Sequence, residues 1–121
     1  MRVFVVKAFI RFQRKERIAD EALCEAIERA EQGLVDADLG GGLIKQRVAR
    51  QGQGKSGGYR TIVAYRVGDR AVFLRGFAKS QQANIEPKEQ RALAVLGREL
   101  LGMNDDELED FIGDGEIMEL E

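Results

Sequence analysis

The chain has 121 residues, of which 44% are hydrophobic and 33% are charged, with a formal net charge of −2. This composition is typical of one globular domain and argues against a disordered or membrane-spanning protein. Because the chain contains no histidine and one cysteine, it excludes Ser-His-Asp and Cys-His catalytic sites, histidine metal ligands, four-cysteine zinc sites and intrachain disulfides.

The N-terminal third predicts a strand, a basic segment and a helix. Residues 3–9 are apolar and β-branched with one lysine, as in a strand, and residues 11–17 are a basic segment. Residues 20–32 carry apolar side chains at helical spacing, and Asp20 is placed to cap the helix. Cys24 lies beside the apolar stripe, where a small core residue is expected and a reactive thiol is the alternative. No signal-peptide cleavage site follows the first strand, so we expect a cytoplasmic protein.

The middle of the chain predicts three strands. Residues 35–42 are a loop, residues 43–49 a half-buried strand, and residues 50–58 a glycine-rich loop. Residues 59–66 and 71–79 then form two strands joined by a hairpin turn centred on Gly68 and Asp69.

Side-chain alternation assigns the charged residues of these strands to faces of the sheet. Lys45 and Arg47 are expected on one face of the first strand, with Ile44, Gln46 and Val48 on the other. In the third strand one face is expected to carry Ala71, Phe73, Arg75, Phe77 and Lys79.

The C-terminal third predicts a helix and an acidic tail. Pro87 suits the first turn of a helix and Gly102 its end. Residues 104–112 are compatible with a short acidic helix, and residues 113–121 are expected to be frayed. The order of strand, helix, three strands and helix predicts an α+β fold, with an antiparallel sheet and helices packed on one face.

The small net charge conceals a separation of charge along the chain. Residues 1–19 hold six basic residues and one acidic residue, whereas residues 20–38 hold seven acidic residues and one basic residue. Residues 39–79 hold nine basic residues with Asp69 as their one acid, and residues 100–121 hold nine acidic residues and no basic residue. The basic middle predicts contact with RNA or another polyphosphate in spite of the negative sum.

The candidate binding residues are the cations of the three central strands and the loop that joins them. They are Lys45, Arg47, Arg50, Lys55, Arg60, Arg66, Arg75 and Lys79. If the strand register allows, they converge on one cationic surface, with Tyr59, Tyr65 or Phe77 available to stack on bases. The alternative is a set of solubilising charges, but such charges are usually mixed in sign.

The glycine-rich loop resembles the end of a nucleotide-binding loop at Gly54, Lys55 and Ser56. Ala49 stands where that motif requires glycine, and a strand rather than a helix follows. We therefore expect no nucleotide triphosphatase, although the loop can still contact phosphate.

Basic residues alone can support RNA cleavage in a chain without histidine. The 2′-hydroxyl attacks the adjacent phosphate, which requires a base, stabilisation of the added negative charge and an acid for the leaving 5′-oxygen. A lysine surrounded by other cations has a lowered pKa and can serve as the base. Arginine stays charged and can hold the phosphate oxygens.

Residues 33–49, 52–66 and 73–80 resemble the HigB-like branch of the RelE/ParE toxin superfamily. The resemblance extends from about residue 3 to residue 101. It implies a compact RelE-like domain over residues 1–102, followed by residues 103–121 as an acidic C-terminal tail. It also implies a toxin of a type II toxin–antitoxin system, whose usual activity is ribosome-dependent cleavage of messenger RNA without metal or cofactor. The implied partner is an antitoxin, often with a helix-turn-helix DNA-binding domain.

The resemblance assigns roles to individual residues of this chain. The catalytic set that it implies is Lys45, Lys55, Arg60, Arg75 and Lys79, with Arg47, Tyr59 and Phe77 as RNA contacts. The charge pattern adds Arg50 and Arg66 to the RNA-binding set. Arg60 and Arg75 would hold phosphate. Lys45 or Lys55 would be the base, and Lys79 would be the acid or a phosphate contact.

Two other functions are compatible with the same residues. One is inhibition of DNA gyrase by a ParE-like toxin, and the other is RNA binding without cleavage by a descendant of the family. The acidic tail from Asp105 to Glu121 is expected to be solvated. The alternative is that it folds over the basic surface or guides the antitoxin, which would make binding sensitive to salt.

Overall fold

The computed structural model describes residues 1–50, 58–82 and 84–121. Its elements are β1 (Arg2–Val6), α1 (Lys7–Glu16), α2 (Asp20–Glu31), β2 (Ala37–Gly40), β3 (Leu43–Val48), β4 (Tyr59–Arg66), β5 (Arg70–Ala78), α3 (Pro87–Leu101), α4 (Asp105–Gly113) and β6 (Ile117–Leu120). The strands form one sheet in the order β2-β3-β4-β5-β1-β6. In the described part of the chain, no helix is long and apolar enough to cross a membrane.

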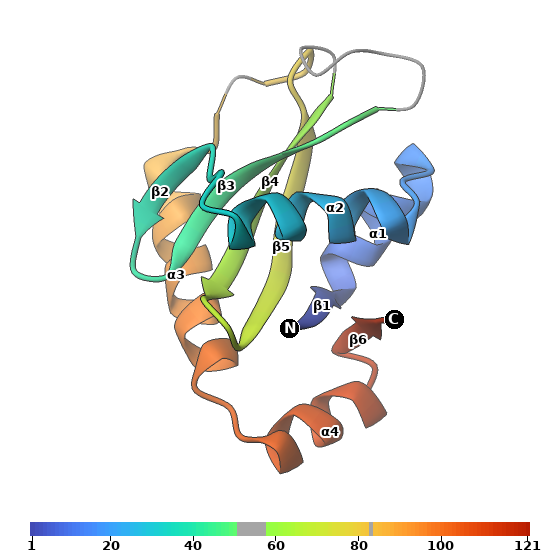
Figure 1. Ribbon diagram of the computed structural model, residues 1–121, viewed down its shortest axis with the longest axis vertical. Coiled ribbons are helices and arrows are strands. Elements are labelled where there is room, and N and C mark those ends of the chain that lie inside the picture. The colour runs from blue at the N-terminus through green and yellow to red at the C-terminus, as the bar shows by residue number, and fades with distance from the viewer. Residues whose placement is uncertain (51–57, 83) are drawn as a thin grey trace.

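Helices lie on both faces of the sheet, with α1 and α2 in front and α3 behind in Figure 1. Phe9 of α1 packs against Phe73 of β5, with ring centroids 5.2 Å apart. On the opposite side, Gly97 of α3 lies so close to the sheet that an added Cβ would be 3.1 Å from Leu43 and 3.2 Å from Ala64. We call these two sides the α1/α2 face and the α3 face.

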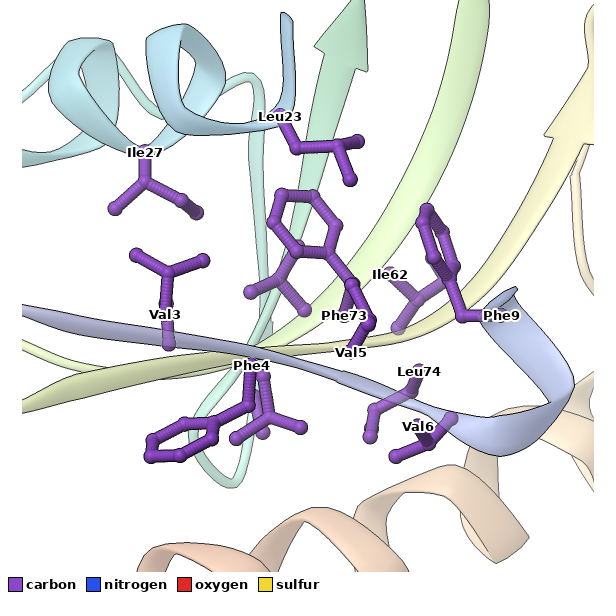
Figure 2. Packing of buried hydrophobic residues seen from close by; sticks show 14 of the residues in the cluster. Val3, Phe4, Val5, Val6, Phe9, Leu23, Ile27, Ile62, Phe73 and Leu74 are labelled. Carbon is purple, nitrogen blue, oxygen red and sulfur yellow. The ribbon is translucent and has the colours of Figure 1, made fainter. Parts of the chain in front are cut away.

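The predicted α+β class is confirmed, but two details differ from the prediction. β1 runs parallel to β5, so the sheet is mixed rather than purely antiparallel. The helices do not pack on one face, because both faces of the sheet are apolar. Figure 2 shows Val3 and Val5 of β1 on the side of α2, with Phe4 and Val6 on the other side. All four side chains are buried, which requires helices to cover both faces of the sheet.

The N-terminal strand is shorter than predicted because a helix begins at Lys7. Phe9 and Gln13 are the buried residues of α1, and their separation of four positions places them on the same side of a helix. The segment predicted to be merely basic is therefore an amphipathic helix. The helix predicted over residues 20–32 is confirmed by α2, which ends one residue earlier. Asp20 does not cap it as expected: Ala19 is the N-cap residue, and Oδ1 of Asp20 accepts a hydrogen bond from Nε2 of Gln13 at 2.6 Å.

The alternation expected along β5 fails at a β-bulge. Val63 pairs with Phe73 and Ile62 pairs with Arg75, so Leu74 is an extra residue on β5. An extra residue reverses the side on which every later side chain of the strand lies. Arg75 and Phe77 therefore lie on the α3 face, and they do not share a face with Phe73 as predicted.

The hairpin turn predicted at Gly68 and Asp69 is present between β4 and β5. Gly68 has a φ of 74°, a left-handed conformation that glycine adopts at little cost. The loop expected over residues 35–42 includes the short strand β2, which pairs antiparallel with β3. Its four residues are too few to give a recognisable alternation.

The acidic C-terminal residues are ordered rather than frayed. The predicted short helix is present as α4, and it begins with a capping box between Asn104 and Glu107. After it, β6 pairs antiparallel with β1 at the edge of the sheet, and Arg2 holds Glu119 at 2.9 Å. Figure 1 shows that the two ends of the chain lie close together as a result. This edge is on the far side of β5 and β1 from β3, so the tail does not cover the basic residues of β3 and β4.

Cys24 behaves as the expected small packing residue of α2. It is partly buried against the core. Burial raises the pKa of its thiol, and the carboxylates of Asp20, Glu28 and Glu21 raise it further. Because the thiolate is the reactive form, this environment makes the thiol less reactive than an exposed one.

Candidate functional site

The strand register brings four of the predicted cations onto the α3 face. Lys45, Ile62 and Arg75 form one row across β3, β4 and β5, and Arg47, Arg60 and Phe77 form the next row. Directly paired residues have Cβ atoms about 5 Å apart, and diagonal neighbours are about 7–8 Å apart. We call Lys45, Arg47, Arg60 and Arg75 the basic array. Without the bulge at Leu74, Arg75 would lie on the opposite side of the sheet from the other three residues.

Arg60 is at the centre of the array. Its residue is only 7% exposed, and Nη1 is a buried nitrogen without a hydrogen-bond partner in the described residues. Burial lowers the pKa of the guanidinium and the charge of Arg47 lowers it further, whereas Asp36 raises it. An arginine remains protonated at neutral pH in spite of such a shift. A buried charged donor without an acceptor is costly, and a phosphate oxygen would supply the acceptor.

Arg75 is held by neighbours on the α3 face. Its Nε lies 2.9 Å from Oε2 of Glu89 in the first turn of α3, and its Nη2 donates to Oε1 of Gln82 at 3.3 Å. Its Nη1 donates to the carbonyl of Gly76. The guanidinium is thereby fixed in orientation, since an arginine offers five N–H donors in a rigid fork.

Lys45 and Arg47 occupy the outer strand of the array. Nζ of Lys45 donates to Oδ1 of Asn84 at 3.1 Å, which ties the strand to the segment before α3. Asp36 accepts a hydrogen bond from the backbone N–H of Arg47 at 2.6 Å, and its other carboxylate oxygen lies 4.0 Å from Nε of the same residue. The side chain of Arg47 is 46% exposed. Arg47 is therefore open to a ligand.

The remaining predicted residues are not all brought to the array. Lys55 lies outside the described residues. Lys79 is exposed in the turn that follows β5. Arg66 forms an ion pair with Asp69 at the hairpin. It lies six residues along β4 from Arg60, so the two arginines are about 20 Å apart. The register thus separates Arg66 from the site.

Arg50 and Tyr59 lie on the α1/α2 side instead. The guanidinium of Arg50 is 5.7 Å from the centroid of the Tyr59 ring, and both residues line a cavity of about 460 Å³ with residues 16–19. Tyr59 packs edge-on against Phe12 at 5.5 Å, and burial raises the pKa of its hydroxyl.

The prediction that Tyr59 or Phe77 stacks on RNA bases is wrong for this structure, because both side chains are buried. Tyr59 is 2% exposed and Phe77 is 3% exposed, so neither ring presents a face to a base in this structure. Phe77 instead lies beneath Arg75, whose guanidinium carbon is 5.8 Å from the ring centroid. The ring supports Arg75 by packing and by a cation–π contact.

Sequence reasoning did not identify the residues that orient the array. Asp36, Gln82, Asn84 and Glu89 come from loops and a helix start that are distant from β4 in the sequence, and no local motif marks them. Arg70 is a different case: it is one of the nine basic residues in residues 39–79, but its role is structural. It donates from Nη1 to the carbonyls of Leu100 and Met103 at the end of α3.

The described ranges contain no group of three or more Cys, Asp and Glu side chains placed to hold a metal ion. The polar groups of the array are three guanidinium groups and one ammonium, which are donors and not metal ligands. The chemistry that this arrangement offers is therefore the binding of anions and the stabilisation of negative charge.

Comparison with protein families gave a match over nearly the whole chain. The model of the RelE toxin of the RelE/RelB toxin–antitoxin system matches residues 1–120, a range that includes the acidic C-terminal residues. A search of curated proteins found no significant match.

Proposed function

This chain belongs to the RelE toxin family, and on that premise we propose that it cleaves messenger RNA on the ribosome. It acts in the cytoplasm as the toxin of a type II toxin–antitoxin system of the HigB-like branch. The observation that supports cleavage is the basic array, because the strand register gathers Lys45, Arg47, Arg60 and Arg75 on one face of the sheet. The proposed scheme needs no metal or cofactor.

Arg60 and Arg75 hold the scissile phosphate in this proposal. They lie on adjacent strands as diagonal neighbours, about 7–8 Å apart at Cβ, so two long guanidinium side chains can reach one phosphate group. Each can donate to the non-bridging oxygens, whose negative charge increases during attack by the 2′-oxygen. Arg47, directly paired with Arg60, is exposed and is placed to contact a neighbouring phosphate.

The proton transfers are assigned to lysines. The amine nitrogen of Lys45 or Lys55 takes the proton of the 2′-hydroxyl while the 2′-oxygen forms its bond to phosphorus. The bond between phosphorus and the 5′-oxygen breaks, and the ammonium of Lys79 gives its proton to that oxygen. The products are a 2′,3′-cyclic phosphate and a free 5′-hydroxyl. Each lysine acts as general acid or base, a role worth about 10²–10⁴ in rate.

Glu89 must release or share Arg75 when RNA binds. The Nε of Arg75 is 2.9 Å from this carboxylate, and both side chains are about one-third exposed. The carboxylate keeps the guanidinium in place before RNA arrives. A phosphate can then approach the Nη atoms, because only three of the five N–H groups are needed for the protein contacts.

The proposed partner is an antitoxin of the helix-turn-helix type, which would neutralise the toxin until it is degraded. Charge supports contact with an acidic segment of such a partner, since the array gathers four cations on one face. Co-expression of the neighbouring reading frame should restore growth of cells that express the toxin. Failure of that frame to restore growth would contradict the assignment of the antitoxin.

The test is primer extension on a reporter messenger RNA after induction of the wild type, Arg75→Ala or Arg66→Ala. Cuts within the translated frame should appear with the wild type and should need translation. Arg75→Ala should reduce them by about 10²–10³, the usual effect of removing one donor that stabilises developing charge. Arg66→Ala is the matched control, because it removes an exposed arginine about 20 Å from Arg60 and should cut normally.

Other outcomes would identify a different function. Growth arrest with DNA damage and uncut RNA would indicate gyrase inhibition of the ParE type. Neither cuts nor arrest, with RNA binding retained, would indicate a non-catalytic descendant. Equal loss of cutting in both arginine variants would contradict the role given to the basic array.

A further inference from the structure

The basic residues of α1 form a second charged surface that is separate from the basic array. Lys7, Arg11, Arg14 and Lys15 are all exposed. At 100° per residue they lie within an arc of about 100° on one side of the helix, opposite the buried Phe9. We call these four residues the α1 stripe. It is about 12 Å long, because its ends are eight residues apart at 1.5 Å per residue.

The charges of the α1 stripe are not neutralised within the protein. Across residues 1–50, 58–82 and 84–121, none of the four side chains forms an ion pair or a side-chain hydrogen bond. Glu116 lines the same groove of about 260 Å³ as Lys7 and Arg11, and it too forms no ion pair with them. The stripe is thus available to an anionic partner.

Helix stability does not explain this pattern. A cation at the first position of a helix opposes the helix dipole, yet Lys7 begins α1 and the first turn has no acidic residue. Arg11 lies in the middle of the helix, where the dipole has little effect. Only Arg14 and Lys15, in the last turn, are placed favourably for the helix itself. A sequence selected for stability alone would place acids at the start of α1.

The stripe is suited to phosphates and not to bases. The two aromatic residues of α1 face inward, with Phe9 against Phe73 at 5.2 Å and Phe12 against Tyr59 at 5.5 Å. Binders of single-stranded RNA combine cations with aromatic platforms, whereas double-helical RNA stacks its bases inside and presents its phosphates. A convex helix with cations and no exposed ring therefore fits the backbone of a duplex.

We propose that the α1 stripe binds the phosphate backbone of double-helical RNA, at a surface distinct from the basic array. The basic array lies on the α3 face and α1 packs on the opposite face, since Gly76 faces Phe12 of α1 and its neighbour Arg75 faces Glu89 of α3. The Lys7 and Arg11 end of the stripe reaches the sheet edge, where it shares a groove with Leu96 and Leu100 of α3. One RNA can therefore place a single-stranded segment at the array and a duplex at the stripe at the same time. The duplex contact does not depend on cleavage.

The test uses an RNA duplex of about 20 base pairs and fluorescence anisotropy with the full chain over a range of salt concentration. Two variants each remove half of the stripe: Lys7→Gln/Arg11→Gln and Arg14→Gln/Lys15→Gln. The matched control is Arg91→Gln/Arg98→Gln, which removes two exposed charges from α3. Circular dichroism checks that each variant is folded.

Each stripe variant should weaken duplex binding about eightfold per lost phosphate contact at 0.1 M salt. Each should also lower the slope of log Kobs against log salt by about 0.9 per contact. The control should bind as the wild type does. The proposal is wrong if both stripe variants bind like the wild type, or if the control loses as much affinity. It is also wrong if the variants lose affinity for the antitoxin and keep it for the duplex, which would make the stripe a protein-docking surface.

Discussion

The substitution Gly76→Ala is expected to destabilise the domain by about 2 kcal/mol, the middle of the range for overpacking of a core. A Cβ on Gly76 would lie 2.6 Å from Cδ2 of Phe12 and 3.1 Å from Cζ. The ring cannot easily move away, because Phe9 packs on it at 5.6 Å and Tyr59 packs edge-on at 5.5 Å. Helix α1 would have to shift away from β5.

Thermal unfolding followed by circular dichroism measures this effect. A domain of 121 residues unfolds with an entropy of about 0.25 kcal/mol/K, so a loss of 2 kcal/mol lowers the Tm by about 8 °C. Gly113→Ala is the matched control, because an added Cβ at that end of α4 has no atom within 4 Å. Its Tm should stay within about 2 °C of the wild type, as for most surface substitutions.

A second variant tests whether Phe12 is the cause. Phe12→Leu makes room beside Gly76, so the double variant should be less destabilised than the sum of the two single variants, by about 1 kcal/mol. A wild-type Tm for Gly76→Ala would refute the close packing of α1 on β5. Strict additivity in the double variant would show that the strain arises elsewhere.

Three further predictions concern groups whose environment the fold fixes. Glu119→Gln should cost about 1 kcal/mol at pH 7 by removing the bidentate pair with Arg2. Because that pair lowers the folded pKa of Glu119, the difference in Tm should shrink as the pH falls below the ordinary value of 4.5 and vanish once the pH is below the lowered folded pKa; a pH-independent difference would contradict this. Cys24 should react with a thiol reagent at pH 7 more slowly than an unfolded cysteine, since its pKa is raised, and an equal or faster rate would show an activated thiol. Gln46→Leu should lower the free energy of unfolding, measured in urea, by about 2–4 kcal/mol. The reason is that this fully buried amide donates to two backbone carbonyls and accepts from the N–H of Asp36. A loss below about 0.5 kcal/mol would contradict that role.

Much of the fold follows from local sequence patterns. Apolar spacing predicts helix α2, and the turn residues Gly68 and Asp69 predict the hairpin between β4 and β5. Helix α1 is not predicted, because its helical pattern is confined to ten residues directly after a strand. Strand β6 is missed for a different reason. Its pairing with β1 joins residues more than 100 positions apart, and the acidic composition around it suggests a solvated tail.

The sequence by itself determined which chemistry is available to this protein. Without histidine and with its cations concentrated in residues 39–79, it could be expected to bind polyanions through lysine and arginine. Only the tertiary structure decided which cations lie together on one face. The bulge at Leu74 places Arg75 on the same face as Arg60. The length of β4 separates Arg66 from the basic array, and burial of Tyr59 keeps its ring from contact with RNA bases. Register and bulges depend on pairing between distant segments, so alternation within one strand cannot reveal on which side a residue will finally lie.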